Sequence, residues 1–131
     1  MPIEYTVSDD GHFIHAVASG SVTGEEFVEY ELAHGFDKRI RPPAAELFEI
    51  ERGALRQVTR NDVSEVLERR NDLGGVFTVH RCAIVVSYGD EHAWDLAEFY
   101  EFMTILHSPE VVIVFGDVGV ARRWLGFDKR R

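Results

Sequence analysis

The C-terminal segment from Glu110 to Gly126, EVVIVFGDVGVARRWLG, places the strongest constraint on the fold of this chain. Its continuous apolar run, Val111 to Phe115, is typical of a strand covered on both faces and is too short to cross a bilayer. Asp117 is suited to cap a following helix, and Gly126 is suited to end it. The segment therefore predicts a buried strand that leads into a helix. Variants of this unit upstream indicate an α/β sheet protein.

Alternation, apolar runs and capping residues predict four further strands and three further helices. We expect strands at 3–7, 12–19, 45–50 and 82–87, and helices at 23–34, 91–107 and from Thr59 to the Gly74-Gly75 pair. The first two strands flank Asp10-Gly11 and form a hairpin. The predicted order is β-β-α-β-α-β-α-β-α, a mixed five-stranded sheet with four helices, in which parallel neighbours are joined by right-handed crossovers.

Composition limits the class of protein. With 131 residues, 45% of them hydrophobic, the chain is expected to form a single domain. Its formal net charge of -9 disfavours a nucleic-acid partner, because phosphate binding requires clustered Lys and Arg. A single cysteine, Cys82, excludes an internal disulfide, and no segment has the character of a signal peptide or the length of an integral membrane span. We therefore expect a cytoplasmic protein.

The element order is accompanied by three segments with a family resemblance: GSVTGEE at 20–26, RCAIVV at 81–86, and the ending from Val114 to Leu125. Together they resemble the SpoIIAA-like branch of STAS domains. The resemblance covers 1–126 and leaves 127–131 as a short basic tail. It implies a STAS fold and a non-enzymatic module, without a required cofactor, that binds protein partners or small ligands.

The resemblance also raises the question of a phosphosite. In anti-sigma-antagonist members of the family, a serine is phosphorylated at the start of the helix after the third strand, within an Asp-Ser-Ser-Gly type motif. Residues 54–62 of this chain lack that motif, and Thr59 is the hydroxyl nearest the corresponding place. The helix dipole and Arg56 or Arg60 would favour a phosphate there, whereas Asp62 would oppose it. Thr59 is thus either a phosphosite or simply the helix cap.

No catalytic or metal-binding signature is evident in the sequence. His12 and His15 lie three apart on a predicted strand and so point to opposite faces, and the other histidines fall at separate element ends, so we expect no metal site. Cys82 is expected to be buried and unreactive. The densest polar cluster is Asp90, His92 and Asp95 at the end of the fourth strand, where ligands often bind open α/β sheets. Helix capping and solvent exposure are the alternative explanation.

The predicted third helix has more apolar residues than one inward stripe requires. We expect Trp94, Phe99, Tyr100, Phe102 and Met103 to provide a contact surface, with Asp95, Glu98 and Glu101 as its polar rim. Large exposed apolar patches usually mark binding surfaces, and two-fold pairing is the commonest assembly, so the sequence predicts a homodimer through this helix. One alternative is an apolar small molecule or lipid bound between the helix and the sheet; another is burial of these residues within their own chain.

Overall fold

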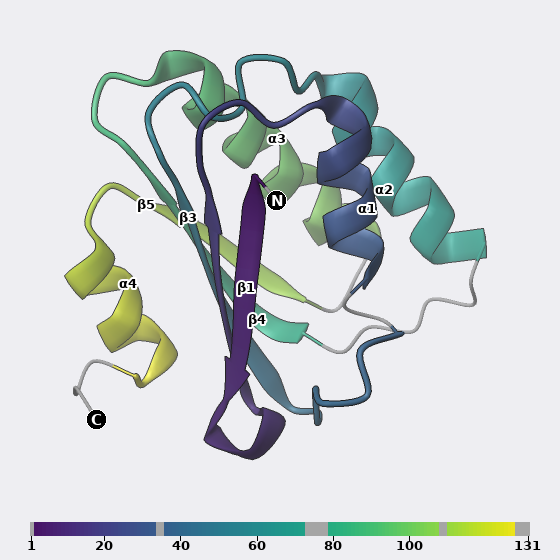
Figure 1. Ribbon diagram of the computed structural model, residues 1–131, viewed down its shortest axis with the longest axis vertical. Coiled ribbons are helices and arrows are strands. Elements are labelled where there is room, and N and C mark those ends of the chain that lie inside the picture. The colour runs from purple at the N-terminus through teal and green to yellow at the C-terminus, as the bar shows by residue number, and fades with distance from the viewer. Residues whose placement is uncertain (1, 34–35, 73–78, 108–109, 128–131) are drawn as a thin grey trace.

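A computed structural model of the chain describes residues 2–33, 36–72, 79–107 and 110–127, which form one mixed β-sheet with helices on both faces (Figure 1). The predicted order of strands and helices is confirmed. The strands are β1 (Ile3–Ser8), β2 (Phe13–Ala18), β3 (Ala44–Ile50), β4 (Val79–Val86) and β5 (Val111–Phe115). The helices are α1 (Gly24–Ala33), α2 (Arg60–Asp72), α3 (Glu91–His107) and α4 (Val118–Leu125).

The five strands lie side by side in the order of the sequence, β1-β2-β3-β4-β5. β1 and β2 are antiparallel and form the predicted hairpin, whereas every later neighbour is parallel. The hairpin connection requires a glycine, because Gly11 has a φ of +95° and a Cβ at this position would lie 2.3 Å from the carbonyl oxygen of Arg39. This topology leaves β1 and β5 as the two edge strands.

The helices divide unequally between the two faces of the sheet. α1, α2 and α3 lie on one side and α4 on the other (Figure 1). The larger core lies under the three helices and includes Ile14, Phe48, Val58 and Val86, all buried. The smaller core, under α4, consists of six buried residues: Phe13, Ala45, Leu47, Ala83, Ala121 and Leu125. Both faces of β3 and β4 are therefore covered, which explains their continuous apolar sequences.

Three helix starts carry the caps that the sequence predicts. Thr23 and Glu26 form a reciprocal capping box: the Glu26 N–H donates to the Thr23 hydroxyl at 3.1 Å and the Thr23 N–H donates to the Glu26 carboxylate at 2.9 Å. Thr59 and Asp62 form the same arrangement at the start of α2. Asp117 accepts a hydrogen bond from the Val120 N–H at 3.0 Å, at the start of α4.

Helix ends follow the sequence less uniformly. Gly126 ends α4 in the left-handed conformation, with a φ of 85°. α2 extends to Asp72, and Gly74 and Gly75, which were predicted to end it, lie outside the described residues. None of the described helices combines the length and apolar character that a bilayer span requires.

Candidate functional site

The outer face of α3 changes character along its length. Phe102, Ile105 and Leu106, which share one face of the C-terminal half, are 58%, 70% and 60% exposed. β5, the edge strand against which α3 packs, begins with the exposed residue Val111. The N-terminal half of the same helix instead presents Glu91, Asp95 and Glu98. The helix therefore has an apolar half and an acidic half on its solvent side.

The five predicted contact residues of α3 separate into three environments. Tyr100 is buried in the core of the chain and is therefore absent from the surface, because it lies on the inward face of α3 with Ala93, Leu96, Ala97 and Thr104. Trp94, Phe99 and Met103 are half-buried, and Trp94 and Phe99 pack against the main core. Phe102 is exposed. The surface patch is thus formed by Phe102 with Ile105 and Leu106, which we call the α3 patch.

A cleft of about 440 Å³ lies at the carboxyl ends of β4 and β5, beside the start of α3. Its walls are the connection from Ser87 to Asp90, one stripe of α3, and Gly116 after β5; the α3 residues are Glu91, Trp94, Asp95 and Glu98. This is the position in an open parallel sheet where ligands commonly bind, and the volume lies in the usual range of ligand sites.

The predicted polar cluster of Asp90, His92 and Asp95 does not converge on one point. Asp90 accepts hydrogen bonds from the Gly53 N–H at 2.9 Å and from the Ala93 N–H at 3.3 Å, so it joins two backbone segments. His92 Nε2 lies 2.8 Å from the carbonyl oxygen of Val58. Each residue has its own structural partner.

Asp95 is the third member of that cluster, and it is paired with Arg60 on α2 at 2.6 Å. The guanidinium of Arg60 also lies 4.8 Å from the centre of the Phe99 ring. Asp90 and Asp95 nevertheless both line the strand-end cleft.

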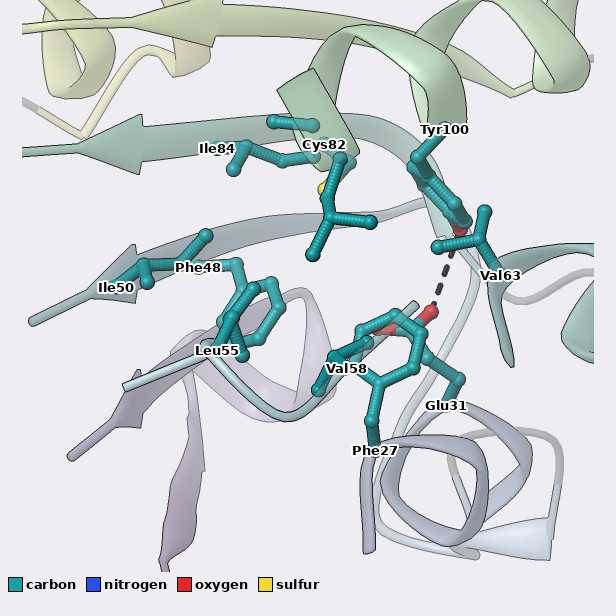
Figure 2. Close-up of a pocket in the computed structure, with 12 residues that line it drawn as sticks. Phe27, Glu31, Phe48, Ile50, Leu55, Val58, Val63, Cys82, Ile84 and Tyr100 are labelled. Carbon is teal, nitrogen blue, oxygen red and sulfur yellow. Dashed lines mark hydrogen bonds between the residues drawn. The ribbon is translucent and has the colours of Figure 1, made fainter. Parts of the chain in front are cut away.

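A buried charged cluster, which the sequence analysis did not identify, lies between the sheet and helices α1, α2 and α3. Arg70 donates to Glu31 at 2.8 Å and to the Tyr100 hydroxyl at 2.9 Å, and it lies 3.6 Å from Glu110. Glu31 and Glu110 are 4% and 5% exposed. The Tyr100 hydroxyl donates to Glu31 at 3.3 Å (Figure 2). We call this group, with Tyr30 and Glu46, the buried polar cluster.

Glu46 on β3 extends the cluster toward the centre of the sheet. The Tyr30 hydroxyl donates to its carboxylate at 2.5 Å, and Glu46 is 2% exposed. Burial raises the pKa of Glu46, and it raises the pKa of the Cys82 thiol well above its ordinary value. Cys82 is buried, as predicted, and the raised pKa keeps its thiol protonated. This setting is the opposite of the exposed electropositive one that activates a cysteine.

Burial also raises the pKa of Glu110, to about 8, although Arg70 acts in the opposite direction. Burial alone would lower the pKa of Arg70, but the neighbouring Tyr100, Glu31 and Glu110 raise it, so Arg70 stays charged. Among the described members of the buried polar cluster, the guanidinium of Arg70 thus contacts two carboxyl groups, Glu31 and Glu110, and its charge also acts on a third, Glu46. Protons on the carboxyl groups limit the excess negative charge that this arrangement would otherwise hold.

Among the described residues, one group of side chains could in principle hold a metal ion, and it overlaps the buried polar cluster. Ligand-type atoms of Glu46, Cys82 and Glu110 all lie within 4.8 Å of one another. His12, His15 and His92, the histidines whose side chains the structure describes, do not take part in this group. Arg70 and Tyr30 already contact its carboxylates, so the group is bound into the hydrogen-bond network of the core.

Two features of the sequence could have revealed the buried polar cluster. Arg70 is spaced four and seven residues from Val66 and Val63, so it continues the inward stripe of α2. Glu31 follows the buried Phe27 by four residues and continues the inward stripe of α1 in the same way. A charged residue on an apolar stripe indicates a buried charge that requires a partner.

A small cavity borders the buried polar cluster beneath α3 (Figure 2). Its volume is about 20 Å³, and its walls include Phe27, Phe48, Leu55, Cys82 and Tyr100. A space of this size holds about one water molecule. An apolar ligand or lipid between α3 and the sheet would therefore require α3 to move away from the strands.

Thr59 lies immediately before α2, where its hydroxyl accepts a hydrogen bond from the Asp62 N–H at 3.2 Å and donates to the Asp62 carboxylate at 3.1 Å. The residue is exposed. A phosphate at this hydroxyl would displace the carboxylate that completes the cap. Its geometry is that of a helix cap.

No family model, curated protein or solved structure matches this chain. The resemblance to STAS domains remains a prediction from the sequence segments and their order.

Proposed function

We propose that this chain is a STAS-like, non-enzymatic interaction module that forms a reversible homodimer through the α3 patch. The observation that carries the proposal is the exposure of Phe102, Ile105 and Leu106 on one face of a helix at the edge of the sheet. Burial of apolar side chains is favourable by about 25 cal/mol for each Å² of apolar surface that is removed from water. Three adjacent ones on a small acidic protein indicate a binding surface.

The charge distribution along α3 favours a second copy of the chain as the partner. Glu91, Asp95 and Glu98 lie in the N-terminal half, and the α3 patch lies in the C-terminal half. In a two-fold, antiparallel crossing of the C-terminal halves, the apolar residues meet and the acidic halves point away from each other. This arrangement buries the patch without bringing like charges together. Because the patch is small, we expect a reversible dimer rather than an obligate one.

Ile105→Glu tests the proposal by placing a carboxylate in the centre of the patch. We expect the wild type to show a concentration-dependent monomer–dimer equilibrium in sedimentation velocity, and the variant to dissociate at least about tenfold more readily, equivalent to about 1.4 kcal/mol. Val120→Glu is the matched control, since Val120 is also exposed on a helix but lies on α4, across the sheet. A wild type that stays monomeric at high concentration, or equal weakening by both substitutions, would contradict the proposal.

A further inference from the structure

The strand-end cleft has an aromatic wall that the proposed dimer does not use. Trp94 is half-buried on α3, and its ring lies against the end of β5: a Cβ on Gly116 would be 4.0 Å from Trp94 Cζ3. Tyr88, in the connection between β4 and α3, is 94% exposed at the same cleft. The electron-rich face of an aromatic ring attracts cations, and tryptophan does so most strongly.

Carboxylates surround this wall. Glu91, Asp95 and Glu98 recur at helical spacing on the same side of α3 as Trp94. Asp95 is neutralised by Arg60, but neither Glu91 nor Glu98 is paired with a cation among the described residues. No lysine or arginine belongs to the described lining of the cleft. The guanidinium of Arg52 lies at the rim, where it donates to the Tyr88 carbonyl at 2.7 Å. The four carboxylates of the cleft lining outnumber the guanidiniums of Arg52 and Arg60, so the cleft has an excess of negative charge next to an aromatic surface.

Two neighbouring groups support this electrostatic description. Burial raises the pKa of Glu101, and the nearby Glu98 carboxylate acts in the same direction. At the start of α3, the carboxylate of Asp90 accepts a hydrogen bond from the Ala93 N–H at 3.3 Å, and its negative charge lies where a bound anion would contact the helix start. The cleft is thus suited to a cation and unsuited to a phosphate or carboxylate ligand.

We propose that the strand-end cleft binds a small organic cation, an ammonium group with apolar substituents, whose charge lies near Glu91 and Glu98 and whose substituents contact Trp94. The volume of about 440 Å³ accommodates a small molecule of this class. A compact inorganic ion would leave the aromatic wall unused. The site lies within one subunit, so it does not depend on the proposed dimer.

The test uses choline as the probe and its uncharged isostere 3,3-dimethylbutan-1-ol as the comparison. The chain has two tryptophans, Trp94 and Trp124, so a Trp124→Phe background makes Trp94 the reporter of a fluorescence titration. We expect choline to change the emission saturably and to bind at least about tenfold more tightly than the alcohol. Equal binding of the two probes, or no saturable response to choline, would overturn the proposal.

Charge variants identify the site of binding. In the Trp124→Phe background, Glu91→Gln with Glu98→Gln is expected to weaken choline binding at least about tenfold. Glu29→Gln with Glu68→Gln is the control, because it removes the same total charge from exposed positions on α1 and α2. If the two double variants lost the same amount of choline affinity, binding would depend on net charge rather than on the cleft, and the proposal would be overturned. Ile105→Glu, which tests the dimer, is expected to bind choline as tightly as the wild type does. Failure of the dimer proposal and failure of the cation-site proposal can therefore be distinguished.

Discussion

Arg69 and Arg70 are adjacent in the sequence and have opposite roles. The Arg69 side chain is 55% exposed and pairs with Glu65 one turn earlier on α2, whereas the Arg70 side chain is 12% exposed and pairs with Glu31 across to α1. Exposed ion pairs contribute little to stability, but removal of one partner from a buried pair leaves the other charge without compensation. The position along the helix, and not the residue type, therefore decides the importance of each arginine.

The pair gives a direct comparison. We expect Arg70→Met to lower the free energy of unfolding by roughly 3–5 kcal/mol. Arg69→Met is expected to change it by less than about 0.5 kcal/mol. Urea denaturation followed by circular dichroism measures both values on the same scale. Similar effects of the two substitutions would show that the buried polar cluster does not contribute as its geometry indicates.

Glu110 predicts a pH dependence of stability. An ordinary glutamate has a pKa of 4.5, and burial raises that of Glu110 to about 8. Between these pH values the folded chain holds a proton that the unfolded chain has lost, so this residue makes the free energy of unfolding fall as the pH rises from about 4.5 to about 8. The contribution of Glu110 to the free energy of unfolding is fully present below about pH 4.5 and is lost above about pH 8.

Glu110→Gln removes the titration while keeping the shape of the side chain. We expect the variant to lose less stability than the wild type between pH 5 and pH 8, by an amount on the order of 1–3 kcal/mol across that range. Denaturation curves at several pH values measure it, with Glu68→Gln on the exposed face of α2 as the control. Parallel pH profiles for wild type and Glu110→Gln would contradict the role assigned to Glu110.

At the scale of elements, the starts of α1 and α2 are packed so closely at Gly24 that a side chain there would displace the Asp62 carboxylate. A Cβ on Gly24 would lie 2.3 Å from the Asp62 carboxylate, which also accepts a hydrogen bond from the Thr59 N–H at 2.8 Å. Helix propensity favours alanine over glycine by up to about 1 kcal/mol. Packing and propensity therefore make opposite predictions for Gly24→Ala.

We expect packing to dominate, with Gly24→Ala destabilising the wild type by roughly 1–3 kcal/mol because the Asp62 side chain must move. In an Asp62→Ala background the obstacle is gone, and the same substitution should be neutral or slightly stabilising. Thermal denaturation of the four proteins in this double-mutant cycle gives the coupling. A stabilising effect in the wild type would show that the helix starts can separate without cost.

The two faces of α3 show how far helical periodicity can be used before the structure is known. An excess of apolar residues on this helix predicted a second surface beyond the one that packs on the sheet. The inward residues are Ala93, Leu96, Ala97, Tyr100 and Thr104, so the rotation of the helix places Tyr100 inside and leaves Ile105 and Leu106 outside. The sequence could not fix that rotation, because almost every angular position of the helix carries an apolar side chain.

At the scale of the molecule, the local features were predictable and the long-range ones were not. Capping residues and apolar runs determine element types through neighbours a few residues away, so Thr23, Thr59 and Asp117 were located correctly. The strand-end position of Asp90 and Asp95 followed from a general property of parallel sheets. The buried polar cluster depends instead on residues that are far apart in the sequence and meet only after the crossovers are complete.

That cluster takes Glu31 from α1, Glu46 from β3, Arg70 from α2, Tyr100 from α3 and Glu110 from the approach to β5. A truncation that removes one of these segments would leave a buried charged group in the hydrophobic core without its counterion. We infer that the chain cannot be divided into smaller autonomous pieces, and that during synthesis it becomes stably folded only after its last strand has left the ribosome.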